Sequence, residues 1–181
     1  MKKLLTIFLA LMMLACTPLM LASCGPEKQE VPQNTKWELS DIQNIELDGK
    51  PIDSVLVSST QEVLKRLYGE YTWTKDSKGY ITETTFNKDR IEFKDGMVYY
   101  HEAVGSGEGE KYNSATVYAS VDWTVEECGT YEGKEITVTF SECIDIYFAE
   151  DQLVMKAQFK SGSSDSITTA DLIFTRVEAL L

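Results

Sequence analysis

Apolar and polar residues alternate along much of the chain after residue 34, and this alternation predicts β-strands. Between residues 115 and 125 every second residue is apolar, and the residues between them carry hydroxyl or carboxylate groups. Segments 136–140 and 152–160 repeat the pattern. Successive side chains of a strand point to opposite faces, so each segment presents one apolar and one polar face. Antiparallel sheets with one buried and one solvated face have this pattern.

Short clusters of turn-forming residues separate these segments. Residues 76–79 and 161–166 are two such clusters, Asp95-Gly96 is a strong hairpin dipeptide, and the glycine-rich stretch 105–114 is expected to be a loop. Short strands joined by local turns predict an all-β fold, an antiparallel meander that closes as a barrel of about eight strands. A β-sandwich is the alternative.

One short helix is expected near residue 60. Ser59 and Glu62 fit a capping box, and Gly69 is placed to end the helix. The apolar stripe of this helix would consist of Val63, Leu64 and Leu67. A helix of this length persists only when it docks, so we expect it to lie across one end of the barrel.

The first residues have the order of a secretory signal. Lys2 and Lys3 precede an apolar run over residues 4–21, and the small residues Ala22 and Ser23 follow it. A membrane-spanning helix is the alternative, because roughly 18 apolar residues suffice to cross a bilayer. Pro18 interrupts the run, however, and no cluster of Lys or Arg follows it. The sequence therefore favours a signal peptide.

The residues Leu21-Ala22-Ser23-Cys24 resemble the lipobox of bacterial lipoproteins. The resemblance implies that residues 1–23 are removed and that Cys24 receives lipid on its sulfur and its new amino group. Cleavage before Cys16 is an alternative that fits less well, because Met13 stands three residues before it. Gly25, rather than aspartate, follows the lipidated cysteine, which by the same resemblance favours the outer membrane, with the domain facing the periplasm or the cell surface. Several acyl chains anchor a protein stably.

The remaining chain divides into a tether and a domain. Residues 24–34 contain two prolines and little to bury, so we expect a lipidated, flexible tether, with one folded domain over 35–181. The net charge is −12 at pH 7, and two lysines leave with the leader. So acidic a chain repels nucleic acid, which excludes nucleic-acid partners.

Two cysteines, Cys128 and Cys143, remain after processing. Outside the cytoplasm they can form a disulfide, worth about 3 kcal/mol for a loop of this length, or remain as two thiols. No CxxC pair or histidine cluster accompanies them, so no metal site is expected.

No catalytic constellation is apparent. His101 is the single histidine, and the chain has no G-x-S-x-G motif. The glycines of residues 105–109 lack the G-K-[ST] ending of a phosphate loop. We therefore expect neither an enzyme nor a cofactor. An envelope hydrolase would require His101 beside a hydroxyl and a carboxylate.

Two ends of the predicted domain carry a further resemblance. Trp37-Glu38-Leu39 opens the first strand and Phe174-Thr175-Arg176-Val177 closes the last, a pattern similar to lipocalin-like lipoproteins. The resemblance implies a barrel with Trp37 and Arg176 as a structural pair in cation–π contact, and the binding of a small apolar or amphipathic molecule.

Two expectations concern the interior of the barrel: it either holds a ligand in a cavity or is filled by side chains. Five inward apolar residues would contact the ligand: Val117, Val121, Trp123, Leu153 and Met155. Alternatively, side chains fill the interior, and the loops contact an unidentified protein or glycan in an envelope assembly.

Overall fold

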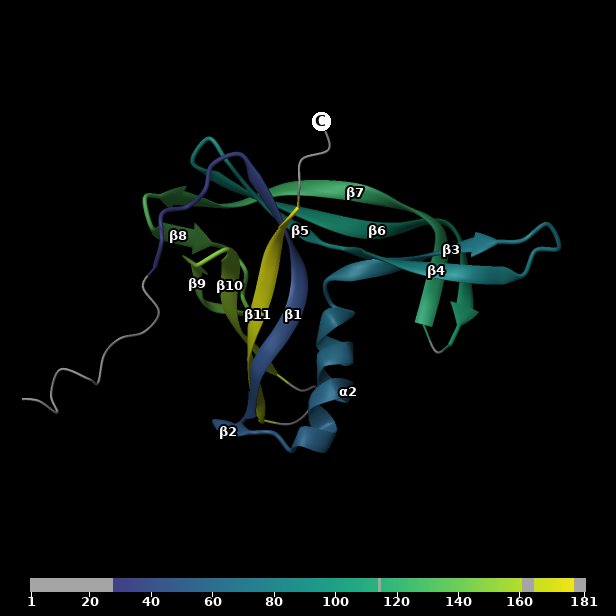
Figure 1. Cartoon of the computed structure of the whole chain (residues 1–181), viewed down its shortest axis with the longest axis horizontal. Coiled ribbons are helices and arrows are strands. Elements are labelled where there is room, and N and C mark those ends of the chain that lie inside the picture. Colours follow the sequence, from purple (N-terminus) through teal and green to yellow (C-terminus); the bar gives the residue numbers. More distant parts are fainter. Residues whose placement is uncertain (1–27, 114, 161–164, 178–181) are drawn as a thin grey trace, which may run out of the picture.

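The computed structural model describes residues 28–113, 115–160 and 165–177. Over these ranges the chain forms a β-rich body with one helix (Figure 1). The strands are β1 (Thr35–Leu47), β2 (Lys50–Pro51), β3 (Gly69–Lys75), β4 (Ile81–Lys88), β5 (Arg90–Lys94), β6 (Met97–Tyr112), β7 (Ala115–Glu132), β8 (Glu135–Val138), β9 (Cys143–Ala149), β10 (Gln152–Lys160) and β11 (Ile167–Val177), and the helix is α2 (Ser54–Lys65). The prediction of an all-β fold with one short helix is confirmed.

All of these strands belong to one sheet. Its order is β4-β3-β7-β6-β5-β1-β11-β10-β9, with β2 paired to β1 and β8 paired to β7. Neighbours run antiparallel except β3 and β7, which pair in parallel at Tyr71↔Val117 and Thr72↔Tyr118. The two ends of the path, β4 and β9, are not paired with each other, so hydrogen bonds do not close the sheet into a barrel.

Two irregular segments bridge part of the opening between β7–β8 and β9–β10. At one level, the backbone N–H of Gln29 donates to Phe148 O and that of Val31 to Gly133 O, each at 3.0 Å. At another level, Thr139 N–H donates to Cys128 O and Gln158 N–H to Glu142 O, each at 2.8 Å. The sheet therefore curls around a core although its ladder is interrupted.

Residues 28–34 are docked against the body. Lys28 Nζ lies 3.0 Å from Asp145 Oδ1 and 5.6 Å from the centre of the Tyr147 ring. The Val31 side chain is buried. The described residues before Thr35, where the sequence analysis placed the start of the domain, thus already make ordered contacts. These few polar and proline-containing residues dock here because they bridge the opening of the sheet.

Aromatic rings fill the concave side of the sheet. Phe148 packs edge-on against Trp37, with centroids 4.9 Å apart, and against Phe93 at 5.1 Å. Phe93 also meets Tyr131 at 5.5 Å. Alternation explains the placement, since Ile91 and Phe93 of β5 point inward while Arg90 and Glu92 do not. Each such buried side chain contributes about 1.5–3 kcal/mol relative to an exposed one.

The Asp95-Gly96 hairpin is confirmed. Both residues have positive φ, 53° and 81°, as the two central residues of a type I′ turn require. This turn joins β5 to β6 and fixes the pairing of Ile91 with Tyr100.

The helix is present, but its predicted start is wrong. Asp53 is the N-cap, and its Oδ1 accepts the Val55 N–H at 2.9 Å. Ser59 lies inside the helix, where its hydroxyl donates to Leu56 O. Helix α2 docks on β1 through the buried Leu64 and through Gln61 Nε2, which donates to Ile42 O at 2.6 Å. Asp53 outcompetes Ser59 because a helix that starts earlier satisfies more backbone groups.

Gly69 does not end the helix but begins β3. Its φ is +148°, and a Cβ atom there would lie 2.3 Å from Asn87 O. Glycine is therefore required for the close approach of β3 to β4.

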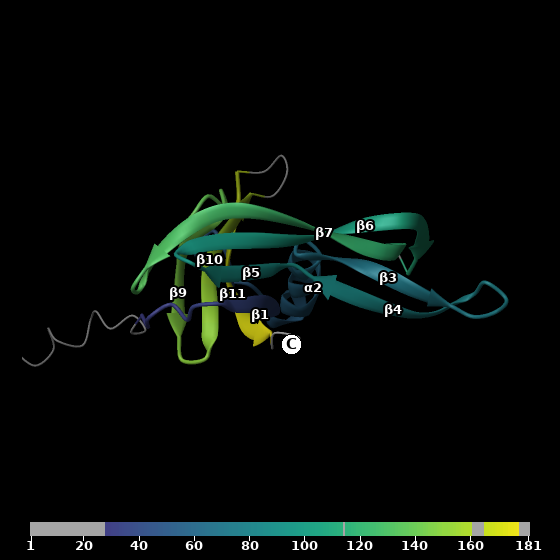
Figure 2. The ribbon, with the colours of Figure 1, turned by 90° about the horizontal axis from the view of Figure 1, so that it is seen from above.

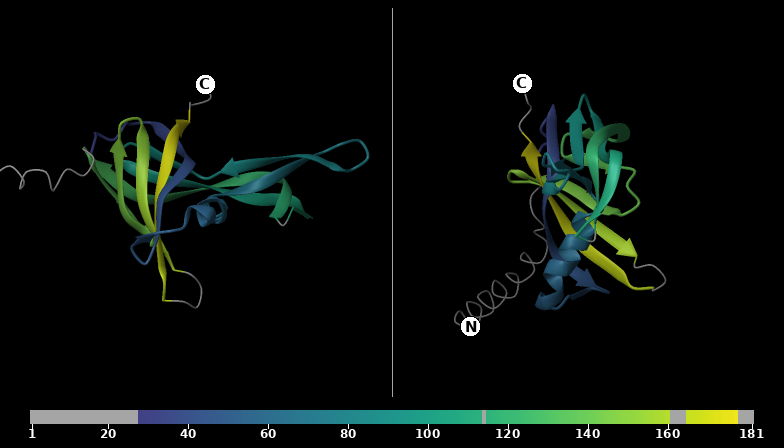
Figure 3. Two further views of the ribbon diagram at one scale, coloured as in Figure 1. Left: turned by 60° about the horizontal axis from the view of Figure 1, so that its bottom comes forward. Right: turned by 90° about the vertical axis from the view of Figure 1, so that its right-hand side faces the viewer.

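The strands β3 and β4, with the distal halves of β6 and β7, extend from the body as an arm (Figures 1 and 2). Figure 3 shows the same arm in profile and end-on. The expected loop at 105–114 is wrong, because β6 continues to Tyr112. A Cβ atom on Gly105 would lie 2.3 Å from the Tyr118 ring, so glycine here makes room for an aromatic residue across the strand pair.

Candidate functional site

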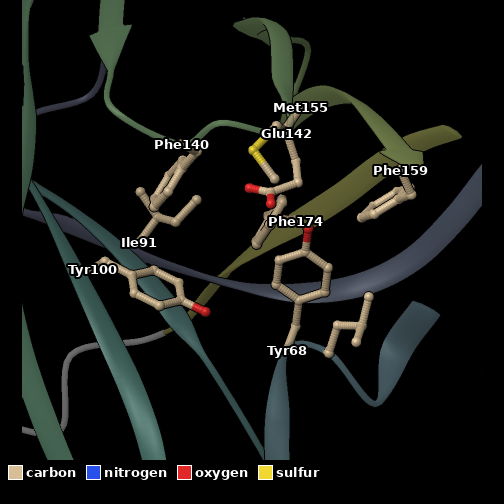
Figure 4. A pocket seen from close by; sticks show the side chains of 9 residues that line it. Tyr68, Ile91, Tyr100, Phe140, Glu142, Met155, Phe159 and Phe174 are labelled. Carbon is tan, nitrogen blue, oxygen red and sulfur yellow. The ribbon is translucent and has the colours of Figure 1, made fainter. Parts of the chain in front are cut away.

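A pocket opens between the end of helix α2 and the concave side of the sheet (Figure 4). Its volume is about 330 Å³, and it is partly open to solvent. Its lining consists of Leu67, Tyr68, Ile91, Tyr100, Phe140, Glu142, Met155, Phe159 and Phe174. Ligand sites in proteins begin at about 300 Å³, so the pocket can hold a small molecule.

Strand alternation places one wall of the pocket. Ile91 of β5 and Tyr100 of β6 are direct cross-strand partners, and both face the concave side. Met155 and Phe159 of β10 are four residues apart, so they also share a face. The wall is therefore built from rigid, paired strands.

The other wall comes from two connections. Leu67 and Tyr68 lie between α2 and β3, and Phe140 and Glu142 lie between β8 and β9. Tyr68 is held by its backbone, since its carbonyl accepts the Asp89 N–H at 3.0 Å and its N–H donates to Lys65 O at 3.1 Å. In Figure 4 the Tyr68 hydroxyl points toward the Glu142 carboxylate.

Tyr68 remains a neutral phenol at ordinary pH. Burial raises its pKa, and the nearby Glu142, Cys143 and Asp89 add to the rise by electrostatic repulsion of a phenolate. Its hydroxyl is therefore a hydrogen-bonding group and not a base.

Tyr100 is oriented by a buried carboxylate. Its hydroxyl donates to Asp89 Oδ2, and the other oxygen of Asp89 accepts the Ala103 N–H at 2.8 Å. Burial raises the pKa of Asp89, although these two hydrogen bonds oppose the rise. Burial, followed by the negative charge of Asp89, also raises the pKa of Tyr100. The Tyr100 ring packs edge-on against Phe140, with centroids 5.3 Å apart.

The wall of the pocket is mostly apolar, and its side-chain polar atoms are the oxygens of one carboxylate and two tyrosine hydroxyls. Glu142 is its one carboxylate, and the lining that the structure describes contains no Lys, Arg or His. No nucleophile stands beside a base in this lining. The arrangement can bind the apolar part of a ligand and accept hydrogen bonds from a polar group attached to it.

The structure disperses the five residues that the sequence assigned to a ligand-binding face. Met155 lines the pocket, while Leu153 is fully buried in the core beside it. Val117 is buried where β7 meets β3, and Val121 is half-buried on the same strand. Trp123 is 38% exposed, with the Arg90 guanidinium 4.5 Å from its ring centre.

A register shift explains why β7 does not line the interior as expected. Cys128 is an extra, unpaired residue of β7 opposite the step from Val98 to Tyr99, and this bulge changes the phase of the β6–β7 pairing. Beyond it Trp123 and Val125 are exposed and Val121 is half-buried, while Cys128 and Tyr131 are buried.

Several pocket residues escaped the sequence analysis. Phe159 belongs to the same alternating run as Met155, so a signal for it existed. Tyr68, Phe140 and Glu142 lie in connections, where no periodicity marks a direction. Only the tertiary fold brings them to the strands.

The predicted disulfide is not formed in this structure. Cys128 and Cys143 are free thiols, the first buried and the second half-buried. The Cys128 thiol instead donates to Val98 O at 3.4 Å. Burial raises the pKa of each thiol to about 11, so both are protonated at neutral pH. The proposed lipidation site, Cys24, lies outside the described residues.

Trp37 and Arg176 are cross-strand partners in the β1–β11 register. Trp37 is buried, its indole N–H donating to Thr35 Oγ1 at 2.8 Å, whereas Arg176 is exposed. The predicted cation–π contact between them is wrong, because Trp37 packs edge-on against Phe148. In the described ranges such contacts join Lys28 to Tyr147, Lys75 to Trp73 and Arg90 to Trp123.

His101 is buried on the face of β6 opposite the pocket side. Its Nε2 lies 2.7 Å from Glu92 Oε2, and Lys36 Nζ lies 3.6 Å from the same oxygen. The histidine thus has a carboxylate partner within a charged cross-strand ladder.

Comparison with protein families, with curated proteins and with solved structures finds no match to this chain. In the ranges that the structure describes, no helix has the length and apolar character needed to cross a membrane. Over the same residues, His, Cys, Asp and Glu side chains nowhere gather in a group of three or more suited to a metal ion.

Proposed function

We propose that this protein is a lipid-anchored lipoprotein of the bacterial cell envelope with a lipocalin-like domain that binds a small apolar or amphipathic molecule. The pocket between α2 and the sheet carries the proposal. It has the volume of a small-molecule site and walls of aromatic and aliphatic side chains. A core filled completely by its own side chains would have no such space.

The order of the N-terminal residues supports the location. The apolar run and the lipobox-like Leu21-Ala22-Ser23-Cys24 are the features from which we infer export, cleavage and acylation of Cys24. The acyl chains would attach the protein to the membrane, with the outer membrane as the proposed site.

The walls of the pocket favour reversible binding over chemistry. Glu142 is the one carboxylate in a lining of aromatic and aliphatic side chains, of which Tyr68 and Tyr100 also carry hydroxyls. A ligand would be held by apolar contact and oriented by these oxygens.

The first test looks for a retained molecule. Native mass spectrometry of the protein after mild extraction should show a bound small molecule that is lost on unfolding. The binding of an apolar fluorescent dye provides a second readout.

A matched pair of variants locates the dye. Leu67, just after helix α2, lines the pocket, whereas Val63, near the end of the helix, is similarly exposed and outside the lining. Leu67→Ser should weaken dye binding about threefold or more, because each lost apolar carbon contributes about 0.8 kcal/mol when buried. Val63→Ser should leave it unchanged. Equal loss in both variants would place the dye on the helix surface and contradict the proposal.

One feature favours a second candidate, an assembly module. The strand β4 is an edge of the described sheet, and Tyr80 at the end of the β3–β4 hairpin is 69% exposed. Exposed edges and aromatic residues are contact elements for protein or glycan partners. Loss of a co-purifying partner in Tyr80→Ser, with dye binding intact, would support this function.

A further inference from the structure

We propose that the pocket selects an organic cation, an amine or ammonium group carried on an apolar body, and excludes carboxylate amphiphiles. This inference rests on the proposed function, because it names the class of ligand for the same pocket. Three independent features of the wall lead to it.

The first feature is the sign of the charge. Glu142 lines the pocket and is exposed at its mouth, and no cationic side chain belongs to the described lining. A bound carboxylate would lose water without gaining a counter-charge. A bound cation would gain one. The net charge of the whole chain, −12 at pH 7, likewise favours cations over anions.

The second feature is the direction of the hydrogen bonds. Tyr100 uses its only hydroxyl hydrogen on Asp89, so the lone pairs of its oxygen remain to accept. The carboxylate of Glu142 accepts as well. A ligand nitrogen that carries hydrogens matches these oxygens, whereas a carboxylate would face them with lone pairs against lone pairs.

The third feature is the aromatic character of the walls. Five of the lining residues have rings: Tyr68, Tyr100, Phe140, Phe159 and Phe174. The faces of such rings attract cations, and cages of rings bind quaternary ammonium groups in other proteins. In Figure 4 the Tyr68 and Tyr100 side chains lie along one side of the pocket, with Glu142 opposite Tyr68.

The experiment uses three probes that share one apolar body. They are 4-phenylbutylamine, 4-phenylbutan-1-ol and 4-phenylbutanoate, which are cationic, neutral and anionic at pH 7. Each is titrated calorimetrically into the full chain, as its host cell processes it, in phosphatidylcholine nanodiscs. Empty nanodiscs supply the blank for partitioning into lipid. The amine should bind about fivefold more tightly than the alcohol, a ratio expected for a partly exposed charge pair, and the carboxylate should bind most weakly.

A matched pair of variants assigns the preference to the pocket. Glu142→Gln should remove the advantage of the amine and leave the alcohol unchanged. Glu83→Gln removes the same charge from an exposed position on β4 and should leave all three affinities unchanged. Equal loss in both variants would indicate a general charge effect and overturn the inference.

The outcomes separate the two proposals. If all three probes bind with equal affinity, or the carboxylate binds best, the cation inference is wrong and the proposed ligand-binding function stands. If none of the three produces a signal above that of empty nanodiscs, both fail.

Discussion

The hydroxyl of Tyr100 donates to Asp89, a carboxylate that is itself only 3% exposed. This bond ties the pocket wall to the turn between β4 and β5. The second oxygen of Asp89 accepts the backbone N–H of Ala103, so one buried side chain binds strand β6 at two positions. Buried polar groups with such partners are costly to leave unpaired.

Removing the Tyr100 hydroxyl should therefore destabilise the fold. Tyr100→Phe leaves Asp89 with one fewer donor and is expected to lower the free energy of unfolding by about 1–3 kcal/mol. The control is Tyr99→Phe on the opposite face of the same strand, which should change stability by less than about 0.5 kcal/mol. Urea denaturation followed by tryptophan fluorescence measures both. Equal effects would show that Asp89 does not depend on the Tyr100 hydroxyl.

The same carboxylate makes stability depend on pH. Burial raises the pKa of Asp89 above its ordinary value of 3.8, assisted by Glu102 and Glu70. The folded state thus binds this proton more tightly than the unfolded state. The contribution of Asp89 to stability is complete below pH 3.8 and falls as pH rises through the raised value.

Comparison with an uncharged variant isolates this contribution. The stability of the wild type relative to Asp89→Asn should decline between acidic and neutral pH, as measured by urea denaturation at several pH values. Asp122→Asn, at an exposed position of β7, sets the baseline. A relative stability that rises with pH would show that hydrogen bonding outweighs burial at Asp89.

The helix start can be tested by a pair of capping variants. Asp53→Ala removes the side chain that accepts the Val55 N–H and should cost about 1 kcal/mol of stability. Ser59→Ala changes a residue inside the helix and should cost less than about 0.5 kcal/mol. Thermal denaturation by circular dichroism would distinguish them. A larger loss for Ser59→Ala would restore the start that the sequence motif indicates.

The two cysteines should behave as protected thiols. Burial raises the pKa of Cys128 and Cys143 to about 11, so little thiolate is present at pH 7.5. Iodoacetamide should modify both only after unfolding, as intact-mass measurement would show. A mass two hydrogens lower before reduction, with no labelling after unfolding, would instead demonstrate a disulfide.

Alternation predicted where strands run better than which face they bury. The apolar residues of 152–160 lie on the core side, and Met155 of this run reaches the pocket. In β7 the same pattern led to Val121 and Trp123, which the bulge at Val98/Tyr99 turns away from the core. Alternation with a period of two identifies a strand, but a bulge in the strand pair decides which face of the sheet its side chains occupy.

The candidate site could be predicted only in part for a similar reason. Met155 and Phe159 follow from periodicity, whereas Tyr68 lies in the α2–β3 connection and Glu142 in the β8–β9 connection, which crosses the open side of the sheet. That crossing rests on long-range backbone hydrogen bonds, such as Gln158 N–H to Glu142 O, which no local pattern encodes.

The docking of Lys28 against Asp145 and Tyr147 has a consequence for orientation at the membrane. With the anchor proposed at Cys24, only residues 25–27 separate the lipid from the docked chain, a reach of at most about 14 Å. So short a linker would hold the domain close to the lipid headgroups, with the surface around Lys28 facing the membrane. The β3–β4 arm lies at the other end of the long axis (Figure 1) and would then reach outward from the bilayer.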